Sequence, residues 1–254
     1  MCRDRGTRPR WPRTCTTAGV PTIHGHETTF TTEPLPKNLE PLDGYFGTFF
    51  ELMRQTLAAG GSELGLAMSL FSLAVSTRAT NVLEIGRFKG LSTLALASAL
   101  KFIDMGWEES SHHKQRPDID YPAFEAPRQR RLISIDPVPT AEATALIERA
   151  GLTKYVAFVN HPSDAVQVQG ELDLLFIDGD HSYEGCARDV MQFVPFVRPG
   201  GYFILHDYYG WFDKNGVNNS PIKKVVDEIP HDRFQRILID TGYPSFVIFH
   251  RPKR

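Results

Sequence analysis

The chain has 254 residues, of which 41% are hydrophobic, so it is long enough for a single α/β domain with a full core. Its 28 basic and 30 acidic side chains nearly cancel, and a formal net charge of -2 offers no global field to attract nucleic acid or an anionic membrane. No apolar run approaches the roughly 18 residues of a membrane span, and the N-terminus lacks the hydrophobic stretch of a signal peptide, so we expect a cytoplasmic protein.

Residues 1–40 contain scattered arginines, prolines and threonines without apolar periodicity, which predicts a flexible N-terminal tail. A basic tail of this kind is also compatible with a nucleic-acid arm or a transit peptide, but Pro9 and Pro12 disfavour an amphipathic helix. Two of the three cysteines, Cys2 and Cys15, fall in this tail, far from Cys186. We therefore expect neither a disulfide framework nor a cysteine-based zinc site.

Residues 41–254 form the predicted domain, which opens with two helices at 42–59 and 62–78, with Ser62 as the expected N-cap of the second. A strand at 81–85 ends in a glycine-rich turn and leads into a helix at 91–102. The polar stretch from about 104 to 130 then reads as an inserted loop. Its paired His112 and His113 could bind a metal, although a solvated loop is the simpler interpretation.

After the insertion, strands and helices alternate to the end of the chain. We predict strands at 131–135, 155–159, 172–177, 202–205, 234–239 and 245–249, with helices at 141–150 and 183–196 and another opening after Pro221. Alternation of this kind requires a mostly parallel sheet covered by helices on both faces. Only residues 240–244 join the last two strands, which is too short for a parallel crossover and predicts an antiparallel hairpin.

The first strand ends in the segment Glu84-Ile-Gly86-Arg-Phe88-Lys-Gly90-Leu-Ser92. In an open parallel sheet, ligands lie at the carboxyl ends of the strands. Gly86 would permit a tight turn close to a ligand, and Ser92 falls in the first turn of the next helix, where free N–H groups can hold a carboxylate. Phe88 stands where a dinucleotide motif requires glycine, which weakens the NAD interpretation. A glycine turn also occurs for packing alone.

The next two strands also end in polar residues. Asp136 is placed to accept hydrogen bonds from ribose hydroxyls, although a solvated acid at a strand end explains it equally well. The loop after the third strand contains Ser163 and Asp164 and suits the edge of an adenine ring.

The sharpest cluster follows the strand at 172–177. It reads Asp178-Gly-Asp180-His181-Ser-Tyr-Glu184, an abrupt group of ionisable residues after an apolar run. The strand at 202–205 adds His206 and Asp207 at the neighbouring strand end. Asp178 and Asp207 are well disposed to share a divalent cation.

These segments, in this order, resemble class I S-adenosylmethionine-dependent methyltransferases, and more narrowly the metal-dependent O-methyltransferases typified by catechol O-methyltransferase and by macrolide-sugar and cephalosporin-tailoring enzymes. The resemblance covers about residues 42–254 and rests on the E-x-G-x-x-x-G-x-S turn together with the F-I-D-G-D-H-S-Y-E-G stretch. It implies a Rossmann-like α/β fold, a seven-stranded doubly wound sheet whose last strand is antiparallel.

The resemblance also implies roles for individual residues. S-adenosylmethionine would contact Glu84, Gly86, Ser92, Asp136, Ser163, Asp164 and Asp178, with Asp136 on the ribose and the pair at 163–164 on the adenine side. The implied metal residues are Asp178, His206 and Asp207. His206 stands where relatives usually carry an acid, so two interpretations stay open: it binds the metal, or it lies nearby without binding it. Mg²⁺ is the first expectation for the metal, yet imidazole suits Mn²⁺ or another transition metal better.

His181 matches the general base of the sugar-modifying relatives, where the catechol enzyme has lysine. A cation held by Asp178 and Asp207 would lower the pKa of a substrate hydroxyl and leave His181 to remove its proton. The expected acceptor is a sugar, polyol or catechol, for instance a natural-product intermediate, and we expect the chain to form a homo-oligomer.

Three alternatives stay open at this stage. One is an NAD-dependent oxidoreductase, and another is a non-catalytic S-adenosylmethionine-binding protein. The third is a component that assists hydroxylation. Aromatic residues after the fifth strand, Tyr208, Tyr209, Trp211 and Phe212, could form a wall over the acceptor, or could equally be core or oligomer contacts.

Overall fold

A computed structural model describes residues 40–105, 129–210, 216, 218–240 and 245–253. The expected tail at 1–40 lies outside this set except for its last residue, and so does most of the expected insertion, including His112 and His113. Trp211 and Phe212 also fall outside it. Within the described part of the chain, no helix is both long and apolar enough to cross a membrane.

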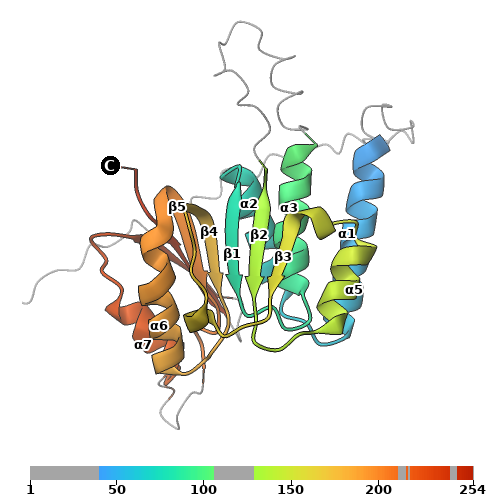
Figure 1. Ribbon diagram of the computed structural model, residues 1–254. Helices are drawn as coiled ribbons and strands as arrows, with labels where there is room; N and C mark the ends of the chain where they lie inside the picture. Colours follow the sequence, from blue (N-terminus) through green and yellow to red (C-terminus); the bar gives the residue numbers. More distant parts are fainter. Residues whose placement is uncertain (1–39, 106–128, 211–215, 217, 241–244, 254) are drawn as a thin grey trace, which may run out of the picture. The chain divides into compact units, whose positions relative to one another are not determined.

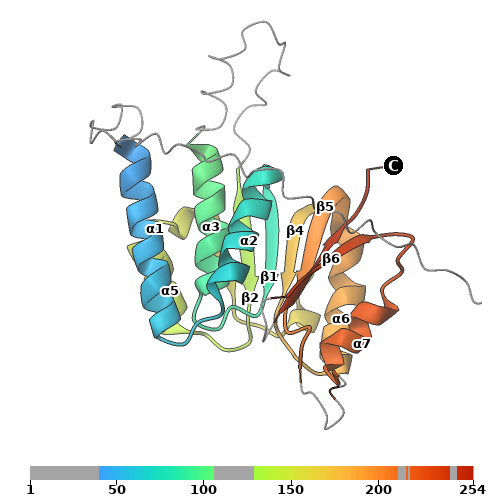
Figure 2. The ribbon, with the colours of Figure 1, turned by 180° about the vertical axis from the view of Figure 1, so that it is seen from behind.

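A seven-stranded sheet forms the centre of the domain, with the strand order β3-β2-β1-β4-β5-β7-β6. Figure 1 labels β1 to β5, and Figure 2 labels β6. The strands are β1 (Asn81–Ile85), β2 (Arg131–Ile135), β3 (Val156–Val159), β4 (Leu172–Ile177), β5 (Val197–Leu205), β6 (Gln235–Ile239) and β7 (Phe246–His250). Strands β1 to β5 pair in parallel, while β7 runs antiparallel to both β5 and β6. The predicted doubly wound sheet and its antiparallel hairpin are confirmed.

Helices cover both faces of this sheet (Figures 1 and 2). One face packs against α1 (Glu40–Ala58), α2 (Leu64–Ser76), α3 (Leu91–Asp104) and α5 (Ala141–Arg149), and the other against α6 (Tyr183–Phe193) and α7 (Pro221–Glu228). Short 3₁₀ turns occur at Thr153–Tyr155, Ser163–Ala165 and Val194–Phe196.

Alternation along the strands explains why two helical layers are needed. In β1, Val82 belongs to the core beneath α2 and α3, whereas its neighbour Leu83 belongs to the core beneath α6 and α7. Because successive side chains of a strand point to opposite faces, an apolar run must be covered twice. All six residues of β4, at the centre of the sheet, are buried.

Two local predictions are wrong. The N-cap of α2 is Glu63 rather than Ser62, so the helix begins at Leu64. Strand β5 begins at Val197, so the Pro199-Gly200-Gly201 segment lies inside the strand rather than before it. Pairing of β4 with β5 shifts register between Leu172 and Leu174, and this irregularity accommodates the extra residues of β5.

The strand register brings the polar strand ends to one edge of the sheet. Ile85 at the end of β1 pairs with Ile135 of β2 and with Ile177 of β4, and Ile177 in turn pairs with Leu205 of β5. Each of these residues is the last of its strand. The residues that follow them, namely Gly86, Asp136, Asp178 and His206, therefore leave the sheet side by side.

Candidate active site

Three side chains from two loops meet at the ends of β4 and β5. The Nε2 atom of His181 lies 3.3 Å from Oδ1 of Asp178 and 3.2 Å from Oδ2 of Asp207. One ligand atom of each of these residues lies within 4.8 Å of the other two, a spacing that could hold a metal ion. His181 is the most exposed of the three, with 57% of its side chain accessible. The imidazole therefore reaches solvent while it contacts both carboxylates.

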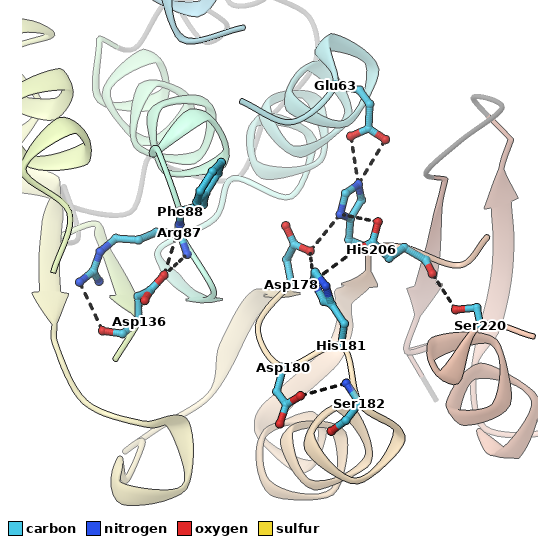
Figure 3. Close-up of polar contacts among 11 residues, drawn as sticks. Glu63, Arg87, Phe88, Asp136, Asp178, Asp180, His181, Ser182, His206 and Ser220 are labelled. Carbon is cyan, nitrogen blue, oxygen red and sulfur yellow. Dashed lines mark hydrogen bonds and ion pairs between the residues drawn. The ribbon is translucent and has the colours of Figure 1, made fainter. Parts of the chain in front are cut away.

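His206, which follows β5, contacts the same two carboxylates and is almost completely buried, with 6% of its surface exposed. Its Nδ1 atom is 2.9 Å from Oδ1 of Asp178 and 3.5 Å from Oδ1 of Asp207. Its Nε2 atom is 3.0 Å from Oε2 of Glu63, at the start of α2 (Figure 3). Both ring nitrogens of His206 therefore face carboxylates.

Sequence reasoning missed Glu63, which lies 143 residues from His206 along the chain. The residue follows the Gly60-Gly61 turn and belongs to no strand end. No pattern in its neighbourhood indicated a polar contact, because the approach of α2 to the end of β5 is a property of the folded sheet.

The carboxylates and imidazoles shift one another's proton affinity. Burial alone would lower the pKa of His206, but hydrogen bonds to Asp178 and Glu63 outweigh it and raise the pKa to about 10. The hydrogen bond to Asp178 likewise raises the pKa of His181. Burial opposes ionisation of Asp178, yet the hydrogen bonds from the two histidines prevail and lower its pKa. Burial raises the pKa of Asp207, and the nearby charge of Asp178 adds to the effect.

Asp207 adopts a left-handed backbone conformation, with φ of 55°. Few non-glycine residues tolerate this region, although aspartate does so more readily than most. Its carbonyl oxygen accepts a hydrogen bond of 2.9 Å from the hydroxyl of Ser220, the N-cap of α7. Backbone strain of this kind concentrates at functional sites, and here it turns the chain sharply at the end of β5.

Gly86 forms the turn after β1 with φ of 84°, as the glycine pattern predicted. A Cβ atom at this position would overlap the carbonyl oxygen of Asp178 and lie 2.5 Å from its carbonyl carbon and 2.9 Å from Cα of Gly179. The missing side chain thus makes room for the backbone that follows β4, and the loop after β1 packs directly against the Asp178 loop.

Glu84 is completely buried, and its carboxylate accepts three hydroxyl groups from within the protein. The hydroxyls of Ser92, Thr93 and Ser134 each donate to it over 2.6 Å. Burial raises the pKa of Glu84 despite these donors. The carboxylate ties the start of α3 to β1 and β2. Direct contact of Glu84 or Ser92 with a cofactor stays a prediction.

Asp136 organises the loop after β1 from the end of β2. Its Oδ2 accepts the backbone N–H groups of Arg87 and Phe88 over 3.0 and 3.2 Å, and its Oδ1 accepts that of Val138 over 2.8 Å. Phe88 is strained, with φ of 43°, and 61% exposed.

Arg87, which sequence reasoning did not single out, extends in the opposite direction and is 3% exposed. Its guanidinium donates to the carbonyl of Ser134 over 2.8 Å and to the side chain of Asn160, and it lies over the ring of Phe158. The buried cation therefore joins the ends of β1, β2 and β3.

The 3₁₀ turn after β3 carries Ser163 and Asp164, the two residues predicted on the adenine side. Ser163 donates a hydrogen bond of 2.5 Å to Oδ1 of Asp189 on α6, whereas Asp164 is exposed. Asp189 is 1% exposed, and its Oδ2 makes no hydrogen bond with the described residues. Burial raises the pKa of this carboxyl group. The contact fixes the turn against α6.

Residues 83–208 match the model of a family described as a methyltransferase domain. A stretch of 42 residues is also 43% identical to an uncharacterized protein of Acanthamoeba polyphaga mimivirus. That match spans 16% of this chain and 19% of the viral protein, so it compares only a small part of each.

Solved structures resemble the domain over most of its length. An O-methyltransferase of Bacillus cereus in complex with S-adenosylhomocysteine has a TM-score of 0.57 at 19% identity and covers 81% of this chain and 90% of its own. The O-methyltransferase TomG of Streptomyces achromogenes, involved in tomaymycin synthesis and bound to S-adenosylmethionine, has a TM-score of 0.56 at 17% identity. This match covers 87% of this chain and 100% of TomG. The S-adenosylhomocysteine-bound methyltransferase PaMTH1 of Podospora anserina has a TM-score of 0.57 at 15% identity, and the match covers 87% of this chain and 99% of PaMTH1. Similarity at these identities shows a shared fold.

Proposed function

We propose that this chain, whose residues 83–208 belong to a methyltransferase-domain family, is an S-adenosylmethionine-dependent O-methyltransferase that acts on a hydroxyl group of a small molecule. The observation that carries this proposal is the convergence of the Gly86 turn with Asp178, His181 and Asp207 at one edge of the sheet. Ligands of open α/β sheets bind at that edge.

The methyl donor would lie across the ends of β1, β2 and β3. Asp136 is the candidate partner of the ribose hydroxyls, and the turn at Ser163 and Asp164 is the candidate neighbour of the adenine. Their positions are held by Arg87 and by Asp189, which join these loops to the rest of the domain. Glu84 would act indirectly, by fixing Ser92 and the start of α3.

The reaction requires that an acceptor oxygen lie in line with the donor methyl group and lose its proton. His181 is the candidate base, because its exposed imidazole is oriented by Asp178 and Asp207. The same two carboxylates are the candidate ligands of a divalent cation, and two carboxylates with nearby imidazole nitrogens suit such an ion. The chemistry that a cation supplies when bound is Lewis acidity, which lowers the pKa of a hydroxyl group.

A substrate with two adjacent oxygens, such as a vicinal diol of a sugar or a catechol, fits a site of this kind best. We include natural-product intermediates in this class because the shared fold extends to an O-methyltransferase of tomaymycin synthesis. A panel of sugars, polyols and catechols, tested with radiolabelled S-adenosylmethionine, would identify the acceptor.

The first experiment compares His181→Ala with wild type, using methyl transfer and calorimetric S-adenosylmethionine binding as separate readouts. We expect loss of transfer with unchanged cofactor affinity. His231→Ala, at an exposed histidine in the turn before β6, is the matched control and should behave as wild type. Treatment with EDTA should abolish transfer as well, and added Mg²⁺ or Mn²⁺ should restore it. Full activity of His181→Ala, or of the chelated enzyme, would remove the corresponding part of the mechanism.

The rival functions separate from this one by binding and turnover. An oxidoreductase would bind NADH in the same calorimeter in preference to S-adenosylmethionine. A non-catalytic or hydroxylation-assisting protein would bind S-adenosylmethionine but transfer no methyl group in a single-turnover experiment.

A further inference from the structure

Glu63 occupies the N-cap position of α2 but does not cap the helix. Its backbone is extended, with φ of -75° and ψ of 147°, and its side chain accepts no hydrogen bond from the first turn. A capping side chain at this position, usually Ser, Thr, Asp or Asn, accepts one of the free N–H groups of the first turn, and the helix dipole favours a negative charge there. Glu63 instead directs both carboxylate oxygens at Nε2 of His206, over 3.2 and 3.0 Å (Figure 3). The side chain thus serves a residue of β5 rather than its own helix.

This contact determines which nitrogen of His206 faces the candidate active site. An imidazole nitrogen that faces a carboxylate can donate a hydrogen to it, and Nε2 is the nitrogen that faces Glu63. The other nitrogen, Nδ1, is then directed at Oδ1 of Asp178 and Oδ1 of Asp207, at 2.9 and 3.5 Å. The ring has little freedom to turn, because it is almost completely buried and held at both ends.

We propose that Glu63 is a positioning residue that orients His206 so that its Nδ1 atom can serve, with Asp178 and Asp207, as a nitrogen ligand of a divalent cation. This inference rests on the proposed function, because it concerns the same candidate metal site. Histidine ligands of metals commonly donate their second N–H to a carboxylate, which fixes the ring and raises its basicity. A cation would bind Nδ1 only in its form without hydrogen, which leaves Nε2 as the nitrogen that donates to Glu63.

A nitrogen ligand at this position changes the expected metal. Imidazole favours first-row transition metals over Mg²⁺, which prefers oxygen ligands. The carboxylate that orients His206 belongs to Glu63, and residue 63 lies before the region 83–208 that matches the methyltransferase family. The segment preceding that region would therefore contribute to the metal preference of the site.

Cobalt binding to the full-length protein tests the inference independently of catalysis, because the visible spectrum of Co²⁺ reports on its ligands. We expect Glu63→Ala to weaken Co²⁺ binding by roughly 10- to 100-fold, the usual effect of removing a carboxylate behind a histidine ligand. Glu63→Gln, which keeps a hydrogen-bond acceptor for Nε2, should retain most of the affinity. The matched control is Glu142→Gln, which removes an exposed carboxylate from the first turn of α5 and should leave Co²⁺ binding unchanged.

A double-mutant cycle separates a specific role from general damage to the fold. In a His206→Asn background, Glu63→Ala should cause no further loss of Co²⁺ affinity, because the ring that Glu63 orients is gone. Additive losses would overturn the inference, as would equal Co²⁺ binding and identical spectra for wild type and Glu63→Ala. If wild type transfers methyl groups but binds no Co²⁺, the inference falls together with the metal part of the proposed function. If wild type and Glu63→Ala bind Co²⁺ with equal affinity, only the role of Glu63 is refuted.

Discussion

Replacing Gly86 by alanine should destabilise the domain and displace the backbone that presents Asp178. Gly86 has φ of 84°, a region in which an L side chain is strained by roughly 1–2 kcal/mol. The added Cβ would also overlap the carbonyl oxygen of Asp178 and lie 2.9 Å from Cα of Gly179. Forcing an atom into a packed site costs about 1–3 kcal/mol. Together these terms predict a loss of roughly 2–5 kcal/mol.

Gly170 provides a matched control for the backbone strain. Its φ of 82° is nearly the same, but a Cβ atom there would have nothing within 4 Å. Gly170→Ala should therefore lose only the strain term, about 1–2 kcal/mol. The difference between the two variants isolates the clash with the backbone after β4, which we place at about 1–3 kcal/mol.

Urea denaturation of both variants and wild type measures this difference directly, provided the slope of the transition is unchanged. Thermal midpoints should differ in the same sense, by about 2–4 °C for each kcal/mol in a domain of this size. We also expect Gly86→Ala, but not Gly170→Ala, to impair S-adenosylmethionine binding and methyl transfer. Equal stabilities of the two variants would refute the close packing of the β1 and β4 loops as the reason for glycine.

Other perturbations test the buried carboxyl groups and the buried thiol. Glu84→Ala leaves three buried hydroxyls without their acceptor and should cost roughly 3 kcal/mol or more in urea denaturation, and a loss below about 1 kcal/mol would contradict the hydrogen-bond network. Burial raises the pKa of Asp189, so its contribution to stability is fully present below the ordinary aspartate pKa and is lost as pH rises through the higher folded value. Asp189→Asn should therefore gain stability relative to wild type as the pH is raised from about 4 to 7, and a difference independent of pH would disprove this reasoning. Burial raises the pKa of the Cys186 thiol to about 12, so in a protein with Cys2 and Cys15 replaced by serine, Ellman's reagent should react only as fast as the protein unfolds.

Several positions show why the details of the site were beyond sequence reasoning. The expected N-cap of α2 was Ser62, whereas the structure has Glu63 there, with its carboxylate on His206. Arg87 lies in the glycine-rich turn after β1, and its guanidinium is buried among the ends of β2 and β3. Ser92 was expected to face a ligand, and its hydroxyl donates to Glu84. The partners of Glu63 and Arg87 come from elements far away in the chain, whereas Glu84 is only 8 residues from Ser92 and contact of Ser92 with a cofactor stays a prediction.

The amino-acid sequence by itself determined the order of strands and helices along the chain and the presence of polar residues at the strand ends. Apolar runs such as 81–85, 131–135 and 172–177 predicted β1, β2 and β4 at the residues where they occur, because strand formation follows local side-chain pattern and burial. It also predicted that Asp178, His181 and Asp207 would lie near one another, since parallel strands end at a common edge. Only the tertiary structure decided which side chains touch. Glu63 contacts His206, and the carboxylate of Glu84 accepts hydrogen bonds from three hydroxyl groups. These contacts form because the packing of helices onto the sheet determines distances that no local pattern encodes.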